Sequence, residues 1–375
     1  MRETPAESPL ATSPRRVALC VFGTLLLVAA ANQGTRLALA AATPNIGYAL
    51  VPQKWRLLQA QQRPAEWLVL GDSSCNQAVD PALLARHLGG EALNLCTVAS
   101  SLALHGAWML DWHVTELGPP RAVAAIHAWH LWHRTLEPFA VAHVPLPFAF
   151  WRVREPRLDP GPAWTLRSAA ARYLPLHAEH RSLARLLARP WEIRARYRVD
   201  ARGFMPVATA GGRGVEKDAR RRLAWLAESP TPRLSPENRA ALGHLGALAD
   251  RHGFDVFLID APLLREIEAA PEFRRYRARL EPELAAVVAR HPRLHRIERS
   301  FPFAAEDMQN ADHLLADAAA RYTREIAAEL SGRLHGPMKR VLLGSDVGAR
   351  LLELRPPRPR EARPRRSRRP GVVSG

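Results

Sequence analysis

Five short, mainly apolar runs along the chain predict the strands of a buried sheet. A short apolar run bounded by turn residues is typical of a strand that is covered on both faces. Segments with helical spacing lie between the runs, for example Pro81 to Leu88 and Ala316 to Leu330. Strands that alternate with helices predict an α/β domain with a parallel sheet. The predicted strands are 67–70, 93–97, 122–128, 254–260 and 294–297.

The α/β pattern lapses between residues 135 and 234. This stretch holds many prolines and several Trp and Arg residues, with helical pieces at 178–189 and 216–227. The glycines of Ala210–Gly214 predict a flexible loop. We therefore expect a helical insertion or cap on the sheet. The α/β pattern resumes with a helix that begins near Ser235.

The N-terminal segment has the composition of a membrane anchor. Val17 to Ala31 is almost wholly apolar, follows Arg15-Arg16, and ends at the polar stretch Asn32 to Arg36. This run is short for a span, which needs about 20 residues, and fits a signal-peptide core or an uncleaved anchor. Cleavage after Ala38-Leu-Ala40 would lie far from the apolar core, which favours an anchor at 17–42. The dibasic pair predicts a cytoplasmic N-terminus and an exported remainder.

These patterns divide the chain into successive segments. A cytoplasmic N-terminus, the anchor and a membrane-proximal linker with a short helix come first. The α/β domain follows in two parts, with the insertion between them, and a basic tail ends the chain. The predicted boundaries are 1–16, 17–42, 43–64, 65–134, 135–234, 235–335 and 336–375.

The net charge of +17 first suggests nucleic acid or an anionic surface as a partner. Much of the excess lies between Arg355 and Arg369, where arginine and proline predict disorder. The sequence has no zinc spacing, RNA-binding signature or Gly-rich phosphate loop, so a nucleic-acid partner is not expected. The tail is either solvated without a specific role or adheres to anionic lipid or acidic polysaccharide.

The chain has three cysteines. Cys20 lies in the N-terminal apolar run. Cys75 and Cys96 lie at the ends of two neighbouring predicted strands. They either pair in an oxidising compartment or remain two buried thiols.

A serine lies where the first predicted strand ends. Gly71, Asp72 and Ser73 follow the run 67–70 directly. Open α/β sheets place their chemistry at the carboxyl edge of the strands, so Ser73 is a candidate nucleophile. The alternative is a serine that caps a turn or a helix. A serine hydroxyl needs a base, and His313 lies just before the last predicted helix.

Gly-Asp-Ser at 71–73 and Asp-His-Leu at 312–314 resemble the first and last blocks of the SGNH (GDSL-like) hydrolase family. The resemblance covers roughly residues 65–330 and is greatest for membrane-anchored, periplasmic members, some of which serve the acylation of cell-surface polysaccharide. It implies a three-layer, flavodoxin-like parallel sheet, with Ser73 as nucleophile and His313 as general base. It implies no metal and no organic cofactor.

The third member of a triad is not evident. In the family an acid commonly precedes the histidine by three positions, where this chain has Asn310. Asp312 directly precedes His313, and a chain neighbour is not expected to turn its carboxylate onto the ring that it flanks. Asp307 can orient the ring if the loop folds back, and Asn310 can do so through a hydrogen bond.

The blocks that supply the family's oxyanion hole also differ. The family uses a glycine after the second strand and an asparagine after the third, and this chain has neither. We expect backbone amides near Ala99 or Ser100 to donate in their place, together with His127 or His130.

Two tryptophans and a third histidine lie in the same loop as His130. Trp129 and Trp132 either line a sugar-binding cleft or pack in the core. His127, His130 and His133 are not expected to bind a metal, because three ligands from one short stretch rarely close a site.

We therefore expect a single-pass protein of the cytoplasmic membrane with an extracytoplasmic domain. The expected activity is that of an acyl esterase or O-acyltransferase on acylated cell-envelope carbohydrate. Envelope polysaccharide assembly proteins are possible partners. The alternative is a catalytically inactive SGNH-like protein that binds glycan or supports envelope assembly.

Overall fold

The computed structural model describes residues 13–42, 46–188, 199–208, 212–228 and 232–334. By its contacts the chain divides into two units, Met1–Ala328 and Glu329–Gly375. The described part of the second unit is residues 329–334, the end of helix α14 (Ala316–Leu334). The predicted basic tail, 336–375, and most of the predicted cytoplasmic N-terminus lie outside the described residues.

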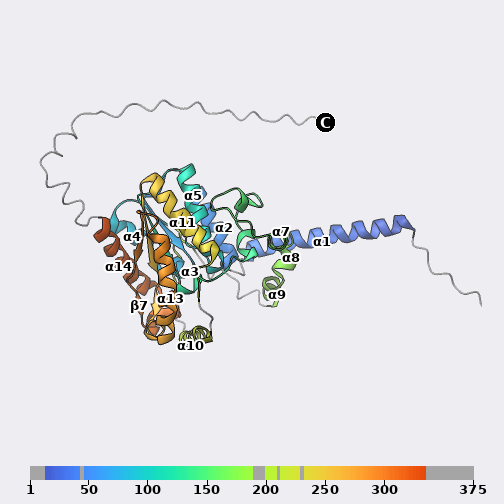
Figure 1. The fold of residues 1–375 in the computed structure, drawn as a ribbon. Helices are drawn as coiled ribbons and strands as arrows, with labels where there is room; N and C mark the ends of the chain where they lie inside the picture. Colours follow the sequence, from blue (N-terminus) through green and yellow to red (C-terminus); the bar gives the residue numbers. More distant parts are fainter. Residues whose placement is uncertain (1–12, 43–45, 189–198, 209–211, 229–231, 335–375) are drawn as a thin grey trace, which may run out of the picture. The chain divides into compact units, whose positions relative to one another are not determined.

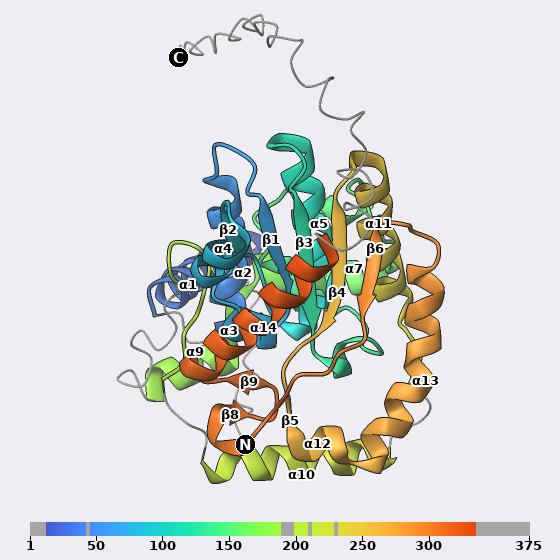
Figure 2. The ribbon, with the colours of Figure 1, turned by 90° about the vertical axis from the view of Figure 1, so that its left-hand side faces the viewer.

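A parallel five-stranded sheet forms the centre of the first unit (Figures 1 and 2). The strands follow one another across the sheet in the order β2-β1-β3-β4-β6, and each neighbouring pair is parallel. The α/β prediction is confirmed, and each strand lies at its predicted place. The strands are β1 (Trp67–Gly71), β2 (Ala92–Asn94), β3 (Ala122–His127), β4 (Asp255–Asp260) and β6 (Leu294–Ile297).

Helices cover both faces of this sheet, as Figure 2 shows. Helices α5 (Leu102–Glu116) and α11 (Pro236–His252) pack against each other behind the sheet in that view. Helix α4 (Pro81–Leu88) and α14 lie in front of it. Every residue of β1 and β3 is buried. This double cover is the reason that these strands have no polar face in the sequence.

Helix α2 (Ile46–Gln59) corresponds to the short helix expected within the linker 43–64, and it packs into the folded domain. Trp55 and Leu58 are fully buried. The Trp55 indole N–H donates to Nε2 of His105 at 3.3 Å, and the Lys54 ammonium donates to the carbonyl oxygen of Asn94 at 2.7 Å. Burial lowers the pKa of Lys54 well below its ordinary value.

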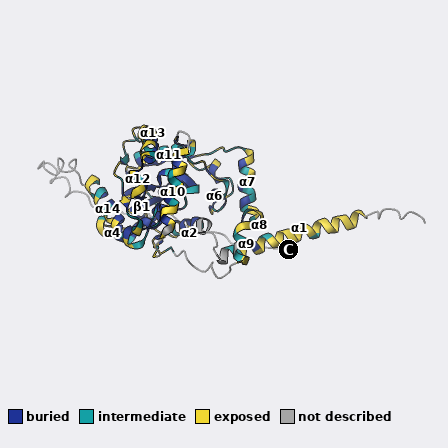
Figure 3. Cartoon of the chain, turned by 90° about the horizontal axis from the view of Figure 1, so that it is seen from below, coloured by how far each residue is buried: buried dark blue, intermediate teal, exposed yellow. Residues whose placement is uncertain are grey.

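The N-terminal apolar segment forms one helix, α1 (Pro14–Ala42). The polar stretch 32–36 does not interrupt it. Residues 14–39 are long and apolar enough to cross a membrane, with a mean hydropathy of 1.8 and none of that window buried. Figure 3 shows α1 mainly in the colour of exposed residues. The helix is therefore a candidate single-pass anchor, and a signal sequence has the same properties.

The insertion, 135–234, holds helices α6 to α10, and its described residues 199–208 form no helix. The predicted helical pieces at 178–189 and 216–227 correspond to α9 and α10, and the described end of the predicted Ala210–Gly214 loop opens α10. Helix α10 contacts the second half of the domain, whereas α8 and α9 contact α1. The helices are α6 (Pro138–Ala142), α7 (Pro162–Tyr173), α8 (Pro175–Ala178), α9 (His180–Ala188) and α10 (Arg213–Glu228).

Short elements complete the second half of the domain. Strands β8 and β9 form an antiparallel pair, and β5 pairs with β7. These four strands were not predicted, because two or three residues are too few to show a period. The short elements are β5 (Leu263–Leu264), α12 (Arg265–Ala269), β7 (Pro302–Phe303), β8 (Met308–Asn310) and β9 (His313–Leu314). The longer helix α13 (Pro271–Val288) lies between α12 and β6 in the chain.

Candidate functional site

Ser73 is the first residue of helix α3 (Ser73–Ala78), which begins directly after β1. Gly71, the last residue of β1, makes this turn possible, because a Cβ there would overlap the carbonyl oxygen of Ile126 on β3. The local sequence therefore brings Ser73 to the carboxyl end of β1, at the point where the strand order of the sheet reverses. Ligands of open α/β sheets bind at such a point.

Asp72, the N-cap residue of α3, joins the loops that follow β1 and β3. One carboxylate oxygen accepts from the Ser74 N–H at 2.9 Å, and the other accepts from the Ala128 N–H at 2.8 Å. Burial raises the pKa of Asp72, and these two amides offset part of that effect. Asp72 therefore acts as a structural clamp between the two loops.

His313 is oriented by two side chains. It is the first residue of β9 and lies directly opposite Asn310 of β8. Its Nδ1–H is shared between Oδ1 of Asn310 at 2.8 Å and Oδ1 of Asp312 at 2.7 Å. A proton on Nδ1 leaves Nε2 with a lone pair, which is what a general base requires.

The structure corrects the expectation for the acid. Asp312 was set aside as a chain neighbour of His313, but the turn between β8 and β9 bends its carboxylate back onto the imidazole. Asn310 orients the ring as expected. Asp307 does not: its carboxylate pairs with Arg321, and the described residues show no hydrogen bond between Asp307 and His313.

Arg222 of α10 holds the same carboxylate from the other side. Its two terminal nitrogens donate to the two oxygens of Asp312 at 2.8 and 2.9 Å. Asp218 accepts from Nε of Arg222 at 2.9 Å and from the Ala311 N–H at 3.2 Å. Burial would raise the pKa of Asp312, but His313 and Arg222 outweigh it and hold this pKa far below the ordinary value.

Helix α3 and strand β9 are in contact, so the turn that carries Ser73 lies next to the strand that carries His313. The charge of His313 also reaches Asp72, whose pKa it lowers against the larger effect of burial. In the described residues no hydrogen bond joins Ser73 Oγ to His313. Catalytic hydrogen bonds are often long without substrate and tighten when it binds.

His130 lies in the same polar network. The residue belongs to the 3₁₀ helix η2 (Trp129–Leu131), and Nδ1 of its ring accepts a hydrogen bond from Arg222 at 3.2 Å. Burial lowers the pKa of His130 to about 4, so the ring is neutral near pH 7. With Nδ1 as acceptor, Nε2 carries the proton and can donate, as expected of an oxyanion donor.

The other expected donors occupy two places. Ala99 and Ser100 are half-buried in η1 (Ala99–Ser101), which follows β2. The start of this loop lies beside the β1 turn, because the Thr97 N–H donates to the Gly71 carbonyl at 2.8 Å. His127 is buried against Trp132, which lowers the pKa of His127 to about 3.

The tryptophans of the β3 loop pack in the core. Trp129 is 8% exposed, with its ring against Phe273 and Tyr276, and Trp132 is 2% exposed. The exposed tryptophan of this region is Trp225 of α10, at 40%. Of the two alternatives that the sequence left for Trp129 and Trp132, the structure has the packed one.

A disulfide joins Cys75 of α3 to Cys96 in the loop after β2, with the two Cα atoms 5.8 Å apart. Both cysteines are fully buried. The bond ties the helix that begins at Ser73 to the loop that leads to Ala99 and Ser100. Of the two alternatives left by the sequence, the structure has the paired cysteines.

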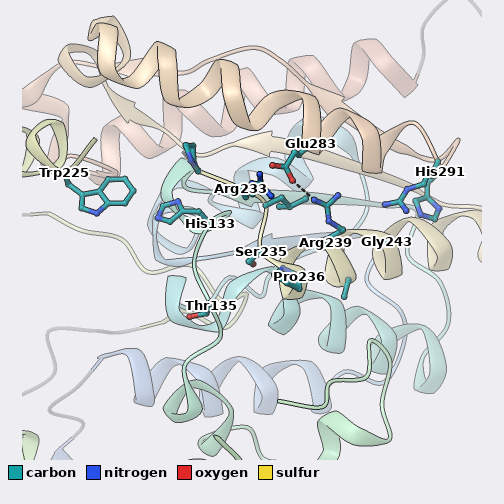
Figure 4. A pocket seen from close by; sticks show the side chains of 14 residues that line it. His133, Thr135, Trp225, Arg233, Ser235, Pro236, Arg239, Gly243, Glu283 and His291 are labelled. Carbon is teal, nitrogen blue, oxygen red and sulfur yellow. Dashed lines mark hydrogen bonds and ion pairs between the residues drawn. The ribbon is translucent and has the colours of Figure 1, made fainter. Parts of the chain in front are cut away.

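A pocket with a volume of about 1150 Å³ lies elsewhere, between α11 and α13 (Figure 4). Trp225, His133 and Arg239 are among the residues that line it. Neither Ser73 nor His313 lines this pocket. Ser73 is thus supported by its place at the edge of the sheet and His313 by its hydrogen bonds, and neither by this pocket.

Sequence reasoning missed two residues of this network, Asp218 and Arg222. They lie about ninety residues before Asp312 in the chain, in a helix of the insertion where no motif marks them. A search with models of known protein families finds no match to this chain. A search of curated proteins finds no relative either.

Proposed function

We propose that this protein is a serine acyl esterase or O-acyltransferase of the SGNH type that acts on cell-envelope carbohydrate. The observation that carries the proposal is the hydrogen bond from His313 to the buried carboxylate of Asp312, on a strand that contacts the helix beginning at Ser73. A base with an orienting acid beside a serine is the arrangement that nucleophilic catalysis requires.

In the proposed reaction Ser73 Oγ attacks the acyl carbonyl carbon of the substrate. Nε2 of His313 accepts the hydroxyl proton and passes it to the leaving sugar oxygen. Water or a second sugar hydroxyl then attacks the acyl-enzyme, with His313 again accepting the proton. The ester bond broken in the first step is thus replaced by an acid or by a new ester.

The remaining groups have supporting roles. Asp312 and Asn310 orient the ring of His313, and Asp312 stabilises the imidazolium that forms. Nε2–H of His130 and backbone amides near Ala99 or Ser100 are the proposed donors to the oxyanion. The mechanism requires no cofactor.

Two features support the class and the place of action. The strand order corresponds to the flavodoxin-like order 2-1-3-4-5, which the SGNH resemblance implies. Helix α1 is long and apolar enough for an anchor, and a buried disulfide is typical of a domain outside the cytosol. We infer a single-pass protein with its domain on the extracytoplasmic side.

One observation favours a second candidate, an inactive SGNH-like protein that binds glycan or supports polysaccharide assembly. Arg222 occupies both oxygens of Asp312 and so neutralises much of the charge that would stabilise a protonated His313. A weaker charge partner lowers the rate of a serine hydrolase.

The test is labelling of the full-length chain in detergent with a fluorophosphonate, which reacts with activated serines. We expect labelling that is lost in Ser73→Ala and kept in Ser74→Ala. Ser74 is the matched control, because its hydroxyl is 1% exposed and has no hydrogen-bond partner in the described residues. A folded wild-type chain that is not labelled would exclude the esterase and favour the binding protein. Labelling that survives Ser73→Ala would show that Ser73 is not the nucleophile.

A further inference from the structure

The pocket between α11 and α13 carries an excess of positive charge. Arg233, Arg239 and Arg290 line it, and Glu283 is the one carboxylate in its lining. Glu283 pairs with Arg239. Arg233 and Arg290 are exposed and have no ion-pair partner within the described part of the chain. Two guanidinium groups are therefore free to bind an anion, and guanidinium forms paired hydrogen bonds with a carboxylate.

The start of α11 adds to this field. Ser235 and Pro236 line the pocket, and Ser235 is the N-cap, whose hydroxyl accepts from the Asn238 N–H. The N-terminus of a helix carries a partial positive charge. The dipole of α11 and the arginines therefore favour the same sign of ligand charge.

An aromatic surface closes one end of the pocket. Trp225 is 40% exposed and stacks on the ring of His133, with the ring centroids 4.8 Å apart. Figure 4 shows Trp225 at one end of the lining residues and His291 at the other, with Arg239 between them. An exposed indole face suits the apolar C–H face of a sugar ring, since Trp offers a large flat apolar surface.

We propose that this pocket binds a short acidic oligosaccharide. Carboxylates of the glycan pair with Arg233 and Arg290, and one sugar ring stacks on Trp225. Pockets of about 300–1000 Å³ hold drug-sized ligands, so a volume of about 1150 Å³ accommodates more than one ring. The combination of carboxylate-binding groups with a ring-stacking surface favours an acidic glycan over a headgroup such as that of phosphatidylglycerol, which offers no ring face.

One residue that lines the pocket is close in sequence to the candidate catalytic network. Trp225 follows Arg222 by three residues on α10, and Arg222 binds Asp312. A glycan that stacks on Trp225 therefore lies beside the helix that holds the acid of the proposed dyad. The choice of glycan as substrate class rests on the proposed function, whereas the charge of the ligand rests on the pocket.

Binding of oligogalacturonate of defined length to the full-length chain in detergent tests the proposal. The matched ligand is the same oligomer with its carboxylates methyl-esterified. We expect the acidic oligomer to bind at least about tenfold more tightly than the ester, with an affinity that falls as salt rises. Equal affinity for both oligomers would overturn the proposal, as would binding of phosphatidylglycerol micelles but not of the oligomer.

Substitutions of residues that line the pocket test whether the oligomer binds there. We expect the double variant Arg233→Gln/Arg290→Gln and Trp225→Ala each to weaken binding about tenfold or more, and Arg251→Gln to leave it unchanged. Arg251 is the matched control because it is an exposed arginine of α11 outside the pocket. Unchanged binding in the pocket variants would place the glycan elsewhere.

The same assay separates this inference from the proposed function. Ser73→Ala should bind the oligomer as tightly as the wild type. Binding without fluorophosphonate labelling would overturn the esterase and keep the pocket. Labelling without binding would keep the esterase and overturn the pocket.

Discussion

Two buried carboxylates lie on either side of the candidate site, one in the loop after β1 and one in the turn between β8 and β9. Asp72 is 1% exposed and Asp312 is 2% exposed. Their pKa values nevertheless shift in opposite directions, because burial dominates for Asp72 whereas His313 and Arg222 outweigh it for Asp312. Equal burial therefore does not decide the state of a carboxylate: the charge of its partners does.

The difference matches two roles. Asp72 accepts from two backbone amides and clamps two loops without a cation. Asp312 accepts from an imidazole and a guanidinium, and so joins the insertion to the base. The two groups also interact, since the charge of Asp312 helps to raise the pKa of Asp72. We infer that one carboxylate shapes the site and the other supplies its electrostatics.

The largest expected effect is that of Asp312→Asn. The rate of fluorophosphonate labelling should fall by about 10³–10⁴-fold, because an amide does not stabilise the imidazolium as a carboxylate does. The free energy of unfolding should fall by about 3 kcal/mol, because Arg222 loses its main buried partner. Labelling kinetics and thermal unfolding measure the two effects. Asp307→Asn is the control, and an equal loss there would show that the assignment of the acid is wrong.

A smaller effect is expected for Arg222→Gln. Asp312 keeps His313 as a partner but loses two charge-assisted hydrogen bonds, so the free energy of unfolding should fall by about 2 kcal/mol. The control is Arg221→Gln, the adjacent and 79% exposed arginine that pairs with Asp218, which should change stability by less than about 0.5 kcal/mol. Denaturant unfolding measures both. Similar losses in the two variants would mean that Arg222 has no special role.

The smallest effect is expected for Asp72→Asn, about 1 kcal/mol near pH 7, because an amide oxygen can keep one of the two N–H bonds. Its pH dependence should oppose that of Asp312→Asn. Folding raises the pKa of Asp72, so the wild type loses stability as pH rises above about 4. The difference in the free energy of unfolding between the wild type and Asp72→Asn should therefore shrink. Folding lowers the pKa of Asp312, so its ionised carboxylate adds stability that is complete above about pH 4 and is lost as pH falls below that value. Unfolding between pH 3 and pH 8 measures both, and parallel curves would contradict the comparison.

The sheet was predictable because its strands are short apolar runs between helices. The runs at 122–128 and 254–260 show this plainly, since β3 and the middle of β4 are buried. A short helix was predicted within the linker 43–64, but the burial of α2 was not, because Trp55 and Lys54 find their partners only on other elements of the fold. Spacing along the chain does not reveal such contacts.

Part of the candidate site was predictable from its two motifs, which place Ser73 after a strand and His313 before a helix. The acid was not, because the direction of the Asp312 side chain depends on a tight turn that pairs Asn310 with His313. Arg222 was not predictable either, since its partner lies far along the chain and its helix has no motif. Site residues that are positioned by local structure are thus easier to predict from the sequence than site residues that are positioned by tertiary contacts.

The Cys75–Cys96 bond has a consequence for how this protein must be made. A crosslink that spans 21 residues stabilises a fold by about 3 kcal/mol, largely by restricting the unfolded chain. A chain that is retained in a reducing cytosol lacks this bond, and the helix that begins at Ser73 is then held by packing alone. Oxidation of the two thiols is therefore a step of maturation, and recombinant production in an oxidising compartment should give the more stable protein.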